Sequence, residues 1–257
     1  MKISASKIKT FKSCRRMYQL RYVEGLTPTK PAEALECGKG YHSILEGIYN
    51  GDITCEDIQP TKEWAMVIAY MKYIYPEFKV CEAERFVKYD FGGDDIMVGY
   101  ADGIAEDGHI VEHKTTSSEI TEQYEYNLLW DEQILAYMLM TGSRKVWYTV
   151  CRKPTIRQKQ NETDEDFFSR MVEWYDTDTE SKIRLLEIER TDEEVAEYEE
   201  NLRVMLATMK EAEQQRNYYR NPCQCNMYGR RCEYSSVCLH YDPSQQYIDY
   251  VREKFNE

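Results

Sequence analysis

The spacing of hydrophobic residues changes twice along the chain, and these changes predict the order of its elements. Apolar residues recur at helical spacing in residues 4–25, 41–50 and 61–76, where Pro76 ends the last helix. Residues 83–91, 96–105 and 109–116 are rich in β-branched and aromatic side chains and are separated by turn residues, which predicts three strands. Residues 127–142 return to helical spacing and end at Gly142, and 145–153 predict a further strand. Beyond Pro154, residues 164–175 and 192–216 have helical spacing, which predicts a helical elaboration.

This order of elements predicts an α/β fold with a mixed sheet. The chain has 257 residues, enough to bury one large core, and nothing in its composition demands a second domain. We therefore expect one elaborated domain.

Charge and hydropathy exclude some classes of function. The net charge of −13 argues against a protein that coats nucleic acid by bulk electrostatics, because phosphate contacts need positive potential. Basic residues do gather in 2–21, 152–159 and 216–231, which leaves room for a locally basic groove. No run of about 18 apolar residues is present, and the first residues lack the apolar segment of a secretory signal. We expect a cytosolic protein with no membrane partner.

The stretch "GYADGIAEDGHIVEHKTTSS" places two acids and a lysine in one predicted hairpin. Alternate residues of a strand share a face, so Glu112 and Lys114 are neighbours. A two-residue loop, Asp107-Gly108, would place Asp102 opposite His113. A three-residue loop that begins at Glu106, with Gly108 in the left-handed conformation, would place Asp102 opposite Glu112 instead. We expect the second register.

Two carboxylates on one face repel each other unless a cation or a proton lies between them. Hard oxygen ligands suit Mg²⁺ or Mn²⁺, which activates water and neutralises charge that develops on a phosphodiester. Lys114 would orient that water or stabilise the transition state. The alternative is a surface ion pair between Lys114 and an acid across the strands.

Six segments in order resemble one family: "SASKIKTFKSCRRMYQLRYVEGL", "GKGYHSILE", "GYAD", "EHKTT", "DEQILAY" and a terminal cysteine cluster. The chain resembles the PD-(D/E)xK nuclease superfamily, in the RecB-like branch that includes phage-encoded exonucleases and CRISPR-associated nucleases. The resemblance implies a restriction-endonuclease-like core, with a central mixed β-sheet flanked by helices, and helical N- and C-terminal elaborations joined by a cysteine-ligated metal cluster. The expected nuclease domain spans 1–257, with a helical region over 1–79, the catalytic core over 80–155, a helical elaboration over 156–220 and a cysteine-rich region over 221–257.

The resemblance also implies roles for single residues. Asp102 and Glu112 become the metal-binding acids, and Lys114 becomes the catalytic lysine. His42 in "GKGYHSILE" and the backbone carbonyl of His113 are implied as further metal ligands. Gln133 and Tyr137 match a Q-x3-Y motif, and four residues apart on a helix they face the same site. Glu84, at the start of a strand, is a further acid that could lie near the metal.

Nine cysteines are present, four of them between Cys223 and Cys238, and such clustering in a cytosolic protein favours a metal over disulfides. The resemblance implies that Cys14 joins Cys225, Cys232 and Cys238 to hold a [4Fe-4S] cluster that fastens the two chain ends. Two alternatives stay open. Cys223 could replace one ligand, and a structural Zn²⁺ site could use the three C-terminal cysteines with His240.

Substrate contacts are expected from "RKPTIRQKQ", where Arg152, Lys153 and Arg157 could line a phosphate track. The alternative for each is ordinary solvated surface. The sequence thus predicts a metal-dependent DNA exonuclease of phage or bacterial recombination and repair, with a single-strand annealing protein as a possible partner. The alternatives are a nuclease that trims DNA for a CRISPR integrase, or a subunit that binds DNA without cutting it.

Overall fold

The structure is a computed structural model of the chain and describes residues 1–28, 33–227, 230–239 and 250–252. Two compact units divide the chain. One comprises residues 1–31, 90–97 and 197–257, and the other comprises residues 32–89 and 98–196. Each unit is described by itself below, and the second carries the predicted catalytic residues.

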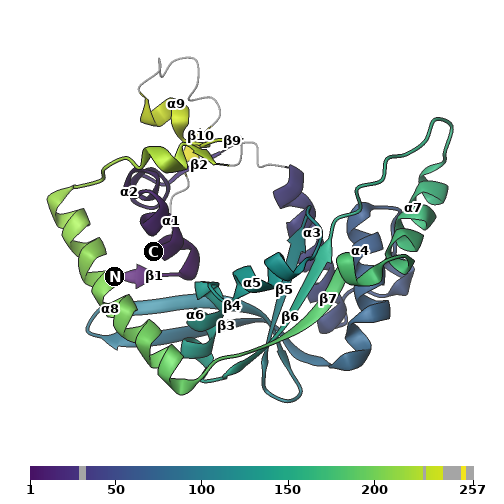
Figure 1. Cartoon of the computed structure of the whole chain (residues 1–257), viewed down its shortest axis with the longest axis horizontal. Coiled ribbons are helices and arrows are strands. Elements are labelled where there is room, and N and C mark those ends of the chain that lie inside the picture. The colour runs from purple at the N-terminus through teal and green to yellow at the C-terminus, as the bar shows by residue number, and fades with distance from the viewer. Residues whose placement is uncertain (29–32, 228–229, 240–249, 253–257) are drawn as a thin grey trace. The chain divides into compact units, whose positions relative to one another are not determined.

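The second unit is organised by a mixed β-sheet (Figure 1). Its strands are β3 (Val80–Gly92), β4 (Asp95–Ala105), β5 (Ile110–Thr116), β6 (Lys145–Arg152) and β7 (Ile183–Glu189). Strands β4, β5, β6 and β7 are neighbours in that order, and β3 pairs with β4. Neighbouring β5 and β6 run parallel, whereas β4 with β5 and β6 with β7 run antiparallel. The prediction of a mixed sheet is confirmed.

The hairpin between β4 and β5 has the three-residue loop. Gly103 pairs with Val111 and Ile104 with Ile110, a register that places Asp102 opposite Glu112. The Ala105 N–H donates to the His109 carbonyl at 2.9 Å, so residues 106–108 form the loop. Gly108 has φ of +81°, a conformation that costs glycine no steric penalty. The predicted register is confirmed.

Helices cover both faces of this sheet. One core joins α3 (Glu33–Asn50), α4 (Lys62–Tyr73) and α7 (Asp164–Glu173) to odd-numbered strand residues such as Val111 and Cys151. The other core joins α5 (Glu122–Leu128) and α6 (Glu132–Thr141) to even-numbered residues such as Ile110 and Tyr148. The even-numbered face of β5 is therefore the face that carries Glu112 and Lys114.

Helix α3 begins eight residues before the predicted start at Tyr41. The prediction started too late because Gly38 and Gly40 have a low helix propensity. Packing explains why the helix tolerates them. A Cβ at residue 38 would lie 3.1 Å from Oγ1 of Thr115, and one at residue 40 would lie 2.9 Å from Cγ of Glu63. Small residues here allow α3 to pack closely against β5 and α4.

Two other predictions are wrong in detail. The helix expected over 127–142 is broken into α5 and α6, because Asp131 caps a new helix by accepting a hydrogen bond from the Gln133 N–H at 2.9 Å. The region 156–220 is not purely helical, because β7 extends the sheet antiparallel to β6.

The other unit contains both described ends of the chain. Its elements are β1 (Lys2–Ile3), α1 (Ala5–Ser13), α2 (Arg15–Tyr18), β2 (Leu26–Pro28), most of α8 (Asp192–Gln215), β8 (Asn226–Met227), β9 (Arg230–Arg231), α9 (Ser235–Cys238) and β10 (Tyr250–Arg252). Ser4 caps α1, and β1 pairs in parallel with Ile96 and Met97 of β4. Among the described helices, none combines the length and apolar character needed to cross a bilayer.

Candidate active site

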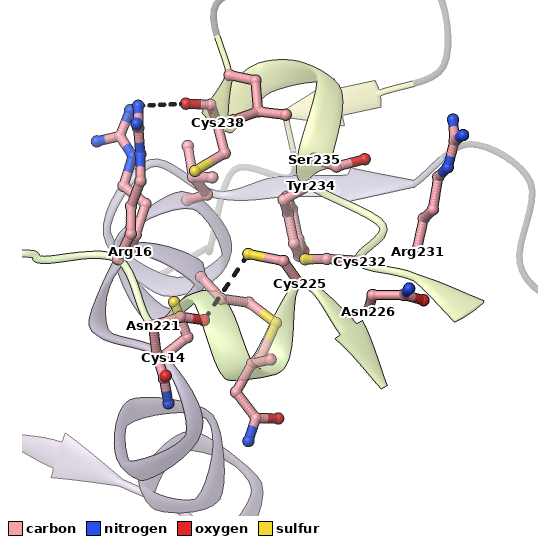
Figure 2. Close-up of a pocket in the computed structure, with 15 residues that line it drawn as sticks. Cys14, Arg16, Asn221, Cys225, Asn226, Arg231, Cys232, Tyr234, Ser235 and Cys238 are labelled. Carbon is pink, nitrogen blue, oxygen red and sulfur yellow. Dashed lines mark hydrogen bonds between the residues drawn. The ribbon is translucent and has the colours of Figure 1, made fainter. Parts of the chain in front are cut away.

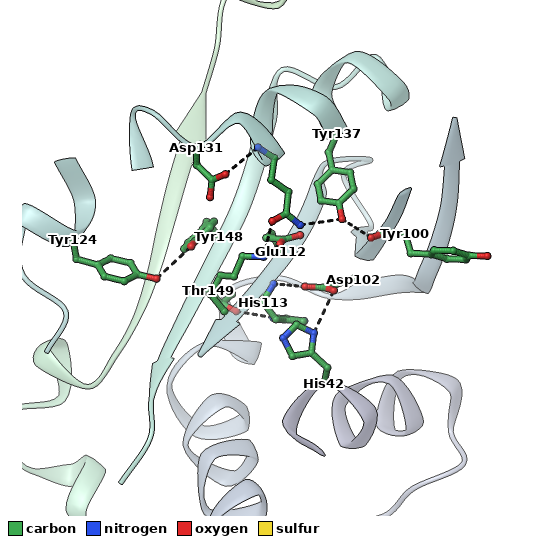
Figure 3. Close-up of polar contacts among 12 residues, drawn as sticks. His42, Tyr100, Asp102, Glu112, His113, Tyr124, Asp131, Tyr137, Tyr148 and Thr149 are labelled. Atoms are coloured by element: carbon green, nitrogen blue, oxygen red, sulfur yellow. Dashed lines mark hydrogen bonds and ion pairs between the residues drawn. The ribbon is translucent and has the colours of Figure 1, made fainter. Parts of the chain in front are cut away.

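The site lies where β4 and β5 part beyond their paired residues. Instead of a main-chain ladder bond, the Asp102 Oδ2 atom accepts a hydrogen bond from the backbone N–H of His113 at 2.7 Å (Figure 3). This contact holds the Asp102 carboxylate between the two strands. Glu112 lies on the neighbouring strand with only 2% of its side chain exposed.

Three ligand-type side chains meet at Asp102. One ligand atom each of His42, Glu84 and Asp102 lie within 4.8 Å of one another. The His42 Nδ1 atom is 3.3 Å from Oδ1 of Asp102 (Figure 3). Three elements, α3, β3 and β4, thus each contribute one side chain to a group that can hold a metal ion.

Glu84 has a special backbone conformation. Its φ is +45°, in the left-handed region that a residue with a Cβ adopts at a cost of about 1–2 kcal/mol. Such strain within a strand re-aims the side chain, and here the carboxylate meets His42 and Asp102. The sequence gives no sign of this conformation, since Glu84 stands in an ordinary strand pattern.

The pKa values follow from burial and from these neighbours. Burial alone would raise the pKa of Asp102, but the His42 hydrogen bond and nearby positive charges lower it below its usual value. Burial would lower the pKa of His42, yet Asp102 raises it overall. Burial and the Asp102 charge raise the pKa of Glu84, and the same two causes raise the pKa of Glu112 to about 8. At Glu112, burial and the Asp102 charge thus outweigh the positive charges of Lys114 and His42.

Lys114 faces Glu112 on the same side of β5. Its ammonium group donates to Oε1 of Glu112 and, at 3.1 Å, to the amide oxygen of Gln133. Burial opposes the charged form of Lys114, but the two acids Glu112 and Asp102 raise its pKa above the usual value. Lys114 is therefore a cation in the site. The predicted contact between Glu112 and Lys114 on this face of β5 is therefore present.

Gln133 and Tyr137 continue this contact from α6 to β4. The Gln133 amide donates to the Tyr137 hydroxyl at 3.1 Å, and that hydroxyl donates to the carbonyl of Tyr100 at 2.7 Å (Figure 3). One chain of hydrogen bonds thus links the lysine to the strand of Asp102. Gly99 is needed for this approach, because a Cβ there would lie 3.0 Å from the Tyr137 ring.

The side chain of His113 points away from the acids. Its Nδ1 atom is 2.6 Å from the hydroxyl of Thr149, and its Nε2 atom is 3.0 Å from the hydroxyl of Tyr49. The ring packs edge-on against Tyr70, and complete burial lowers its pKa to about 3. The imidazole is therefore neutral and engaged in the core, which leaves only its backbone for the predicted metal contact.

Asp131 is a site residue that the sequence analysis missed. Besides capping α6, it contributes to the raised pKa of Lys114. Its signal was present in "WDEQ", where an Asp before a helical run is a typical N-cap. Tyr148, opposite Glu112 in the β5–β6 register, adds a buried hydroxyl that lies 3.3 Å from that of Tyr124 (Figure 3).

The predicted cysteine ligands surround one pocket in the other unit. Cys14, Cys225, Cys232 and Cys238 all line a cavity of about 400 Å³ (Figure 2). Within the described part of the chain, no three of these sulfurs lie within 4.8 Å of one another. Zn–S bonds of about 2.3 Å keep the sulfurs on one zinc ion within about 4.6 Å, so the arrangement is wider than a closed zinc site. His240, the alternative zinc ligand, lies outside the described residues.

The predicted substrate residues differ in their surroundings. Arg152 pairs with Glu119 at 3.2 Å and its guanidinium lies 5.5 Å from the Trp174 ring centre. Lys153 donates to the Thr115 hydroxyl at 2.9 Å, whereas Arg157 is exposed. A phosphate track through these residues stays a prediction.

Comparison with known proteins identifies the family. The model of the PD-(D/E)XK nuclease superfamily matches residues 2–80 and 62–239, most of the chain. The chain belongs to this superfamily, which confirms the predicted resemblance and nuclease class. A comparison with curated proteins finds no match.

Three solved structures of exonucleases are similar to this chain. A proposed exonuclease from Eubacterium rectale is 13% identical, with a TM-score of 0.54 over 99% of this chain and 90% of that chain. A phage-related exonuclease from Haemophilus somnus is 10% identical, with a TM-score of 0.45 over 84% and 97%. An alkaline exonuclease from Laribacter hongkongensis is 14% identical, with a TM-score of 0.38 over 84% and 91%. Of these, the first supports the fold, and the other two fall below a TM-score of 0.5.

Proposed function

We propose that the protein is a metal-dependent DNA exonuclease. The observation that carries the proposal is the meeting of His42, Glu84 and Asp102 in one group of ligand-type side chains, with the buried Glu112 and the half-buried ammonium group of Lys114 beside it. Membership in the nuclease superfamily supplies the reaction class, hydrolysis of a phosphodiester.

The residues fit a divalent cation. The Oε2 atom of Glu112 is buried and has no hydrogen-bond partner among the described residues. A buried carboxylate oxygen without a partner is costly, and a cation would satisfy it. Asp102 and Glu84 offer further hard oxygen ligands, which suit Mg²⁺ or Mn²⁺, and His42 is a fourth candidate ligand. We include the carbonyl of His113 as a fifth.

A bound divalent ion supplies a lower pKa for water and neutralises charge on the phosphate. The protein's own part is to hold the reacting groups in place. Lys114 donates hydrogen bonds toward the attacking water or the phosphate oxygens, where negative charge develops. Gln133 and Tyr137 fix the direction of that lysine.

The remaining features extend this proposal. We assign a [4Fe-4S] cluster to Cys14, Cys225, Cys232 and Cys238, with structural Zn²⁺ as the alternative; the cavity that all four cysteines line supports a shared bound group. We propose DNA ends as substrate, contacts to phosphates through Arg152, Lys153 and Arg157, and a cytoplasmic role in phage or bacterial recombination or repair. A single-strand annealing protein or a CRISPR integrase is the proposed partner.

The test uses purified protein with Mn²⁺ on end-labelled linear DNA and on closed circular DNA. Wild-type protein should degrade the linear DNA, and Lys114→Ala should lose about 100-fold or more of the rate while keeping its fold by circular dichroism. Lys72→Ala is the matched control, because Lys72 pairs with Asp176 on the surface. Equal cutting by wild type and Lys114→Ala would refute the assignment of the site, and cutting of the circle alone would refute an exonuclease.

A further inference from the structure

An exposed aromatic pair lies next to the acids on β3 and β4. Phe86 and Tyr100 have their ring centroids 5.3 Å apart at 60°, and 48% and 57% of their surfaces are exposed. Two large aromatic side chains that pack on each other yet stay open to solvent are typical of a binding surface.

The aromatic pair is continuous with the acidic group. Phe86 lies two residues beyond Glu84, and Tyr100 lies two residues before Asp102, while the Glu84 and Asp102 carboxylates also meet across these strands. Two residues of a strand span about 6.6–6.8 Å. The Cα atom of Tyr100 therefore lies about one such step from that of Asp102. In Figure 3 the Tyr100 ring extends outward from the polar cluster.

The position of Tyr100 is coupled to the catalytic lysine. Its carbonyl accepts the Tyr137 hydroxyl at 2.7 Å, and Tyr137 is linked through Gln133 to Lys114. Because the backbone of Tyr100 is held in this way, its ring has a defined place relative to the site. Exposed Lys88, two residues beyond Phe86, adds a positive charge on the far side of the aromatic pair.

We propose that Phe86 and Tyr100 form a stacking platform for an unpaired base of single-stranded DNA, next to the nucleotide whose phosphate is cut. Proteins that bind single strands combine positive charge along the backbone with aromatic side chains on which bases stack. A paired base offers no free face at a duplex interior, so the platform selects frayed or single-stranded ends. This inference rests on the proposed nuclease function and names the substrate form.

The test measures binding in a Lys114→Ala background with Mn²⁺, so that the DNA stays intact. The probe is a fluorescein-labelled single-stranded 12-mer in which one abasic residue is moved stepwise from the end. One abasic position should weaken binding about tenfold, and Phe86→Ala or Tyr100→Ala should weaken binding of the unmodified strand about tenfold with no further loss at that position. Tyr100→Phe should retain binding, because it retains the ring.

Tyr126→Ala is the matched control. Tyr126 is 55% exposed, and on α5 it lies two residues from Tyr124, so the two side chains point to different faces of the helix. It should bind as the parent does. Circular dichroism melting of each variant separates loss of binding from loss of fold.

Two results would overturn the platform. One is a Phe86→Ala or Tyr100→Ala variant that keeps the parental affinity or the parental sensitivity to the abasic position. The other is a Phe86→Ala or Tyr100→Ala variant that loses as much affinity for a blunt hairpin duplex as it loses for the single-stranded 12-mer. Failure of the nuclease proposal would give a different result: wild-type protein would bind the 12-mer but would not cut it.

Discussion

The ammonium group of Lys114 on β5 lies 3.1 Å from the side-chain oxygen of Gln133 on α6. The same lysine pairs with Glu112. Of its two partners, Glu112 is also a proposed ligand of the cation and Gln133 is not. When a cation takes the carboxylate, the contact with Gln133 remains to direct the lysine. We therefore propose that Gln133 is a positioning residue.

Replacing Gln133 by Ala should lower kcat about 10- to 100-fold, because Lys114 loses its fixed direction, while KM for DNA changes little. Steady-state rates on end-labelled DNA measure both constants. Gln123→Ala is the control, since the exposed Gln123 side chain donates a hydrogen bond to Asn127 on its own helix α5. A rise in KM with unchanged kcat would show that Gln133 binds substrate instead.

Metal-free protein should become less stable as the pH rises from about 6 to 8.5. Glu112 has a pKa of about 8 in the folded state and near 4.5 when unfolded, so between these values the folded state holds one proton more. The raised pKa of His42 acts in the same direction. Thermal melts across this pH range, without divalent ions, measure how Tm changes with pH. A Glu112→Gln variant should flatten it, and an unchanged slope in that variant would contradict the assignment to Glu112.

Mn²⁺ at about 100 times its Kd should raise Tm by about 5–10 °C at pH 8, with a smaller effect at pH 6, since bound metal requires deprotonated ligands. Asp102→Asn should abolish the shift. Asp107→Asn is the control, because Asp107 lies in the hairpin loop and bonds Trp147. A full shift in Asp102→Asn would place the metal elsewhere.

Glu84→Ala and Glu84→Gly should both weaken Mn²⁺ binding, because each removes a carboxylate from the group. They should differ in stability. Glycine tolerates φ of +45°, so the free energy of unfolding of Glu84→Gly should be about 1 kcal/mol larger than that of Glu84→Ala. Denaturant melts of the two variants measure this difference, and an equal stability would mean that the backbone relaxes after substitution.

Protein prepared without air should be brown, with visible absorption and bound iron. Cys232→Ser should lose both, and Cys55→Ser, at an exposed cysteine of the other unit, should keep both. Cys223→Ser should also keep both, because Cys223 does not line the cysteine pocket. Bound zinc without visible absorption would support the alternative site.

Local patterns in the sequence predicted much of the site. Alternation placed Glu112 and Lys114 on one face, and a glycine in a three-residue loop predicted the register that aligns Asp102. Helical spacing placed Gln133 and Tyr137 together, and their contact is direct. These relationships span few residues, so short-range geometry is sufficient for them.

The rest depends on tertiary packing. The conformation of Glu84 has no sequence signal, because a left-handed residue in a strand is imposed by its surroundings. The early start of α3 was hidden by Gly38 and Gly40, whose helix-breaking tendency is overridden by close packing. Strand β7 was missed because a short segment between helices becomes a strand only where β6 offers an edge.

The central claim is that one divalent ion binds among His42, Glu84, Asp102 and Glu112. Anomalous diffraction from crystals grown with Mn²⁺ tests it most directly. The account predicts a manganese peak within coordination distance of both Asp102 and Glu112. A peak at another place, or none in crystals of protein that cuts DNA with Mn²⁺, would contradict it.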